Sequence, residues 1–172
     1  MPMTLDIKTA DELIDSTQEA RWTERRHGPQ AEVLRCVLRA FVERGGPVSV
    51  NTVAAAFPEW PAATVQSHLA ALDQNDLIVL AADTIQFAYP FSASPTAFAV
   101  TFANGQERFA CCATDALGMA AMLGARVRIR SRCHHSGEPL EMDVDPTGPL
   151  GSRDVMVWIG KRGSGERACT GL

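Results

Sequence analysis

Apolar residues recur at helical spacing in the first half of the chain, most clearly in "AEVLRCVLRAFVER" before the stop signal "GGP". The predicted elements are helices over 9–26, 31–44, 50–57 and 62–73, followed by a hairpin of strands over 77–80 and 85–88. The last three of these helices and the two-stranded wing are typical of a winged helix-turn-helix. The pattern therefore predicts an N-terminal, winged-helix-like helical lobe over residues 1–88.

The second half alternates between apolar and polar positions, as half-buried strands do. Its predicted elements are a strand over 97–102, a helix from Cys112 or Ala113 to Leu123, an alternating strand "ARVRIRSRC", its partner "LEMDVDP" and a strand "VMVWIG" over 155–160. In the alternating strand, four arginines share one face: Arg126, Arg128, Arg130 and Arg132. The fold class predicted is α+β, with a small, mostly antiparallel sheet and a cysteine-bearing helix packed on it over residues 89–172.

Composition narrows the class of protein. The chain has 172 residues, of which 46% are hydrophobic and 21% charged, and this balance argues against disorder. No apolar core of signal-peptide type and no 18-residue apolar run occurs, so we expect a cytoplasmic protein without a membrane partner. In that compartment the five cysteines are expected to be reduced thiols.

A winged helix-turn-helix invites a DNA-binding hypothesis, which charge disfavours. No lysine or arginine occurs from Gly45 through Glu107, and the net charge of the chain is −4. Phosphate contacts supply most non-specific affinity for DNA, and they need cations. We therefore expect no nucleic-acid partner, and we expect this lobe to pack on the next domain.

The candidate chemistry lies where the last predicted helix begins. Cys111 and Cys112 are adjacent there, and Asp115 follows three residues after Cys112, on the same helix face. A helix N-terminus lowers the pKa of a thiol, and a carboxylate beside a thiolate tends to hold its proton. Such a pair can bind a soft electrophile such as Hg(II) or Cu(I) and hand over a proton. The alternative is that one thiol faces the core, the other is incidental and Asp115 is a solvated first-turn acid.

Two further clusters are weaker candidates. Cys133, His134 and His135 are consecutive on a strand-to-turn segment, so their side chains alternate between faces and do not converge on a metal. The four arginines are expected to form a solvated face that pairs with acids of the partner strand rather than an anion site. Those acids are Glu138, Glu141 and Asp143.

From about residue 88 to 146 the chain resembles the organomercurial (alkylmercury) lyase family. The resemblance rests on "AYPFSASPTAFAVTFANGQERFACCATDALGMAAMLG", with its Cys-x-x-Asp-x-Leu helix, and on "RVRIRSRCHHSGEPLEMDV". It implies that Cys112 attacks mercury as a thiolate and that Asp115 relays a proton to the carbon leaving group. It also implies that Cys133 is a buried structural cysteine and that Cys169 is the second mercury ligand. Cys111 is an extra thiol beside Cys112 and a candidate to replace a missing mercury ligand, although adjacent helix residues point about 100° apart.

The implied reaction converts an organomercurial into a hydrocarbon and bound Hg(II). No organic cofactor is implied. The implied partners are the small organomercurial substrate and an acceptor of Hg(II), either cellular thiols or a mercuric reductase. The family continues with more sheet and helix after its second cysteine, whereas this sequence stops three residues after Cys169. Either the sequence is truncated or this part of the site is degenerate.

Two other functions stay open at this point. One is a soft-metal chaperone or sensor on the same fold that uses Cys111, Cys112 and Cys169 without catalysis. The other is a winged-helix regulator, which the absence of lysine and arginine from Gly45 through Glu107 disfavours.

Overall fold

The structure is a computed structural model that describes residues 7–9, 11–13, 27–151 and 154–158. Its helical elements are the 3-10 turn η1 (Asp11–Leu13) and the α-helices α2 (Pro29–Arg44), α3 (Val50–Ala55), α4 (Ala62–Gln74) and α5 (Ala113–Leu123). Its strands are β1 (Val48–Ser49), β2 (Ile78–Ala81), β3 (Thr84–Ala88), β4 (Phe91–Ser92), β5 (Ala99–Phe102), β6 (Glu107–Ala110), β7 (Val127–Arg132), β8 (Pro139–Asp145) and β9 (Gly148–Leu150). The predicted α+β class with an antiparallel sheet is confirmed.

The helical half follows the predicted pattern closely. The apolar stripe of α2 is fully buried at Val33 and Val37, and Phe41 is 1% exposed. At the start of α3 the Ser49 hydroxyl accepts the Thr52 N–H at 3.0 Å, an ordinary N-cap. Helices α2, α3 and α4 and the β2–β3 hairpin lie within about two residues of their predicted ranges. Of the predicted helix over 9–26, only residues 9 and 11–13 are described, and the rest lies outside the described residues.

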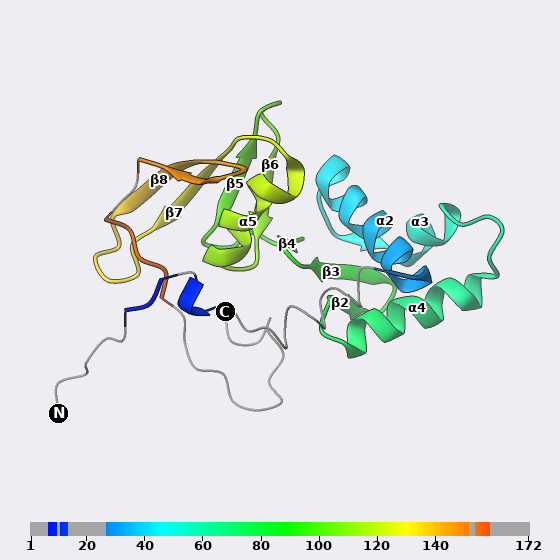
Figure 1. Ribbon diagram of the computed structural model, residues 1–172. Coiled ribbons are helices and arrows are strands. Elements are labelled where there is room, and N and C mark those ends of the chain that lie inside the picture. The colour runs from blue at the N-terminus through cyan, green and yellow to red at the C-terminus, as the bar shows by residue number, and fades with distance from the viewer. Residues whose placement is uncertain (1–6, 10, 14–26, 152–153, 159–172) are drawn as a thin grey trace.

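One antiparallel sheet runs through both halves of the chain. Its order is β1-β3-β4-β6-β5-β7-β8-β9, with β2 paired to β3. Strand β4 makes the connection, because Phe91 pairs with both Ala88 of β3 and Ala110 of β6. Figure 1 shows α2, α3 and α4 gathered around β2 and β3 at one end, while α5 lies with β5 to β8 at the other. The sheet crosses the predicted boundary after residue 88, and the division into 1–88 and 89–172 stays a prediction.

Arg108 of β6 ties the two halves together at the end of α2. Its Nε donates to the Phe41 carbonyl at 2.7 Å and its Nη2 to the Val42 carbonyl at 2.6 Å. The last carbonyls of a helix lack the full set of partners within the helix. The Phe41 carbonyl also accepts the Gly45 N–H at 3.0 Å, and the guanidinium adds a charged donor to it and to the Val42 carbonyl. The strand that leads to Cys112 is thereby anchored to the helical half.

The second half holds α5 against the sheet through Ala116, Met119 and Ala120, each at most 1% exposed. In β7 the predicted alternation is confirmed, with Val127 and Ile129 buried between exposed arginines. The predicted strand over 155–160 is wrong in its described part, residues 155–158, which has no regular structure. The strand instead forms earlier, at β9, because a tight turn after β8 brings Gly148 opposite Asp145.

Among the described residues, no helix has the length and apolar character needed to cross a membrane.

Candidate functional site

Cys112 is the N-cap residue of α5. Its backbone is extended, with φ −149° and ψ −179°, and its Sγ accepts the Asp115 N–H at 3.4 Å. Serine, threonine, aspartate and asparagine are the usual N-caps, so a cysteine in this position is a poor choice for helix stability alone. The strand β6 delivers the thiol to the mouth of the helix, where it is half-buried.

The thiol and the carboxylate meet directly. Cys112 Sγ donates to Asp115 Oδ2 at 3.0 Å, and Thr114 Oγ1 lies 2.8 Å from the same sulfur. The predicted pairing of Cys112 with Asp115 on one helix face is therefore present. Thr114 was not among the predicted site residues. The sequence does show a hydroxyl residue two positions after Cys112.

The protonation of Cys112 differs from the prediction. Burial, and next the hydrogen bond to Asp115, raise the pKa of the Cys112 thiol. The sequence argument considered the helix N-terminus, which favours the thiolate, and omitted the loss of solvent, which favours the neutral thiol. The resting site therefore holds a protonated thiol that donates to an acceptor carboxylate oxygen.

The two adjacent thiols have different surroundings. Cys111 is 3% exposed, and its Sγ donates to the Phe91 carbonyl at 3.3 Å, towards the core. Phe91 is fully buried and stacks on Phe41 with ring centroids 5.9 Å apart. Cys111 thus belongs to the packing between the two halves, while Cys112 faces the helix mouth.

The other predicted thiols do not join the pair. Cys133 was expected to be buried, and this expectation is wrong: it is half-buried in the turn after β7, where a hydrogen bond from the Ser136 side chain lowers its pKa. The strand ends at Arg132, so the alternation that would have pointed Cys133 inward has already stopped. His134 and His135 are exposed, and no cluster of three metal-ligating side chains occurs within the described ranges. Cys169 lies outside the described residues.

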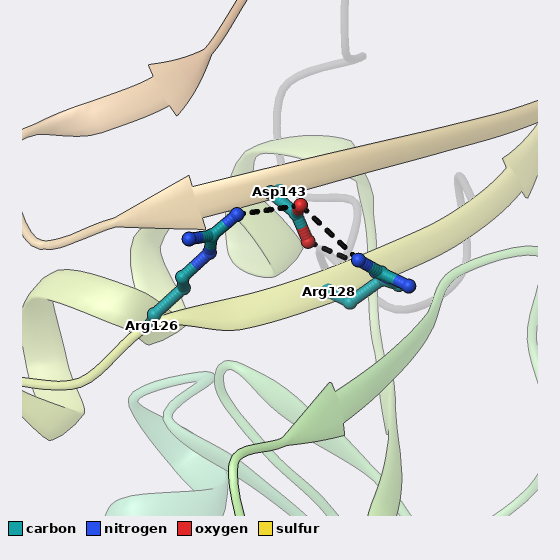
Figure 2. A network of polar contacts seen from close by, with 3 residues as sticks. All are labelled: Arg126, Arg128 and Asp143. Atoms are coloured by element: carbon teal, nitrogen blue, oxygen red, sulfur yellow. Dashed lines mark hydrogen bonds and ion pairs between the residues drawn. The ribbon is translucent and has the colours of Figure 1, made fainter.

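Three of the four arginines form ion pairs, with Asp143 as the one predicted partner and Glu107 as an unforeseen one, while Arg132 donates to the Gly137 carbonyl at 3.1 Å. Figure 2 shows Asp143 of β8 between Arg126 and Arg128, at 2.7 Å and 2.9 Å. Arg130 pairs with Glu107 of β6, a partner set by the register of β5 between the two strands. The paired arginine side chains are exposed, and they lie on β7 or directly before it rather than at the helix mouth.

A surface groove of about 410 Å³ is lined by residues of α2 and by Thr52, Ala56 and Phe57. It contains Cys36, whose pKa is raised by burial, and none of the residues predicted for the site. The chemistry of the thiol and carboxylate therefore lies elsewhere, at the N-terminus of α5.

Known proteins resemble this chain over its second half. Residues 91–170 match the family model of alkylmercury lyase. Alkylmercury lyases of Bacillus cereus and Clostridium butyricum are each 42% identical over 43 residues, which is 25% of this chain and 20% of the relative. The sequence match thus spans about a fifth of the length of these curated relatives.

A solved structure extends the likeness into the helical half. The crystal structure of the mercury-bound form of MerB2 has a TM-score of 0.60 and 26% sequence identity, over 77% of this chain and 65% of that chain. The superposition therefore includes residues outside the range of the family match.

Proposed function

We propose that this chain, whose residues 91–170 match the family model of alkylmercury lyase, cleaves carbon–mercury bonds by protonolysis. The substrate is a small organomercurial cation, and the products are a hydrocarbon and bound Hg(II). One observation carries this proposal: the Cys112 thiol donates its proton to Asp115 Oδ2 at 3.0 Å. A mercury-binding sulfur and a proton carrier are then already in contact before substrate arrives.

The proton balance follows from that contact. As the Cys112 sulfur binds mercury, its proton moves to the Asp115 carboxylate. The Asp115 carboxyl then donates the same proton to the carbon as the carbon–mercury bond breaks and its electron pair stays on carbon. The raised pKa of the Cys112 thiol suits this order, because the resting enzyme supplies the proton that the hydrocarbon needs.

We assign the second mercury-binding thiolate to Cys169, which falls inside the family match over 91–170. Two sulfur ligands withdraw mercury from carbon more strongly than one, because thiolates are the ligands that soft metal ions prefer. Cys111 is left out of this ligand set, since its thiol is buried and donates to the Phe91 carbonyl. External thiols or a mercuric reductase then remove Hg(II), and no organic cofactor takes part.

The helical half acts in this proposal as a winged-helix-like packing module rather than a DNA reader. Arg108 supports this role, because its guanidinium binds the end of α2 instead of standing free on the surface. The absence of lysine and arginine over 45–107 leaves α3, α4 and the β2–β3 hairpin without cations for phosphate.

The test is release of benzene from phenylmercury in excess small thiol. We expect release from the wild-type protein and from Cys36→Ala, a thiol variant outside the site. We expect none above background from Cys112→Ser or Asp115→Ala, and a strong loss from Cys169→Ser. Tight retention of mercury by the wild-type protein without benzene would contradict the lyase proposal and favour a soft-metal chaperone or sensor.

A further inference from the structure

Thr114 makes a contact that neither the resemblance nor the proposed mechanism uses. It occupies the second position of α5, it is exposed, and its Oγ1 lies 2.8 Å from Cys112 Sγ. Among the described residues, the Thr114 hydroxyl makes this hydrogen bond and no other. The Thr114 hydroxyl therefore contacts the sulfur, and it neither caps the helix nor packs in the core.

The direction of this hydrogen bond follows from counting protons. A thiol has one proton, and that of Cys112 points to Asp115 Oδ2. The sulfur can then only accept from Thr114, so the threonine hydroxyl donates. It also donates after the thiol proton has moved to Asp115, because a thiolate is purely an acceptor.

Building on the proposed function, we propose that Thr114 is a further catalytic residue, which holds the Cys112 sulfur in place and donates a hydrogen bond to the thiolate that attacks mercury. The sulfur then keeps two donors when its proton leaves, the Thr114 hydroxyl and the Asp115 N–H. Hydrogen bonds to an ionised partner are stronger than those to a neutral one, so both contacts favour the reactive state over the resting state.

The position of Thr114 suits this role. Cys112 is the N-cap and has an extended backbone, and in this conformation its sulfur reaches the Thr114 hydroxyl at the second position of the helix. Because Thr114 is exposed, its replacement leaves the buried face of α5 intact. Loss of the hydroxyl can therefore be measured without loss of the fold.

The experiment measures how fast iodoacetamide alkylates Cys112, a reaction that forms a sulfur–carbon bond, releases iodide and needs no mercury chemistry. Peptide mass spectrometry follows the reaction, with fragment ions separating Cys112 from Cys111. We expect Thr114→Val, which keeps the shape and removes the hydroxyl, to slow alkylation about tenfold, as does Thr114→Ala. Thr114→Ser should restore the rate to within about twofold, because it restores the donor.

The matched control is Thr101→Val in β5, which should alkylate at the wild-type rate. Thermal unfolding of each variant checks the fold. A wild-type rate in Thr114→Val, or a failure of Thr114→Ser to restore the rate, overturns the proposal. In the lyase assay, Thr114→Val should lower kcat with little change in KM, because the hydroxyl contacts the sulfur and not the organic group.

The two proposals fail separately. If no protein releases benzene while Thr114→Val still slows alkylation, the lyase proposal is wrong and the role of Thr114 at the thiol stands. If benzene is released but Thr114→Val alkylates at the wild-type rate, the lyase proposal stands and the proposed role of Thr114 is wrong.

Discussion

The molecule has two polar clusters of opposite character. At the mouth of α5, Cys112, Thr114 and Asp115 lie within four residues of sequence and meet at one half-buried sulfur. On the β7–β8 sheet, Arg126 and Arg128 meet Asp143 across strands, and the two arginine side chains are 60% and 58% exposed. The second cluster has more formal charge, yet the chemistry that we propose lies at the first.

The difference lies in solvent rather than in the number of charges. Water and salt screen an exposed ion pair, so its formation changes little else in the protein. At a half-buried thiol, lost solvent shifts the proton towards sulfur and strengthens each remaining hydrogen bond. A reactive site is therefore recognised better by partial burial of a nucleophile beside a proton acceptor than by density of charge.

The largest effect is expected from Asp115→Asn. The amide cannot carry the proton to carbon, so benzene release should fall by about 10²–10⁴, the usual contribution of a general acid. Alkylation of Cys112 should not slow, because the substitution removes the carboxylate whose hydrogen bond raises the pKa of the thiol. Measuring both rates on one sample separates proton delivery from thiol reactivity.

Asp143→Asn is the matched control, since it makes the same chemical change in the other cluster. It should retain benzene release. An equal loss of release in both variants would remove the distinction between the clusters.

A smaller effect, on stability, is expected from Arg108→Ala. Unlike the sheet arginines, Arg108 is partly buried and donates to the carbonyls that end α2. Its removal leaves those acceptors without their charged donor, and we expect a loss of about 1.5–3 kcal/mol in the free energy of unfolding. Urea denaturation measures the loss, and an unchanged midpoint would contradict the anchoring role of Arg108.

Features that depend on neighbours in sequence were predicted well. The stripe of Val33, Val37 and Phe41 defines α2, and the Cys112–Asp115 pairing follows from helix geometry alone. Both features can be predicted from the 3.6-residue period of a helix and the spacing of residues along the sequence. The contact of Thr114 with Cys112 does not follow from this period, because residues two apart point to different sides of a helix, and it depends on the extended backbone of Cys112.

Features that depend on burial and register were not predicted. The raised pKa of Cys112 comes first from burial, which the rest of the fold decides. The partnership of Arg130 with Glu107 requires β5 to lie between β7 and β6, a choice that no local pattern contains. Cys133 was misplaced because the strand ends one residue earlier than its alternation suggests.

Arg128→Ala should have less effect than Arg108→Ala, although it removes two hydrogen bonds to a carboxylate. The guanidinium is exposed, and water replaces what is lost. We expect a thermal midpoint within about 2 °C of the wild-type value, and a still smaller difference in 1 M salt, where the Debye length is about 3 Å. A drop as large as that of Arg108→Ala would show that the sheet arginines are structural anchors too.

The smallest effect is the pH dependence of the Asp143 cluster. Hydrogen bonds from Arg128 and then Arg126 lower the pKa of Asp143 from 3.8 to about 2. Because the folded pKa lies below the unfolded one, the contribution of Asp143 to stability is complete above about pH 3.8 and is lost as the pH falls through about 2. The wild-type protein and Asp143→Asn should therefore differ most in unfolding midpoint at neutral pH and converge below pH 2. A difference that grows on acidification would have the wrong sign for a lowered pKa, and it would mean that Asp143 is stabilised by its proton rather than by the two arginines.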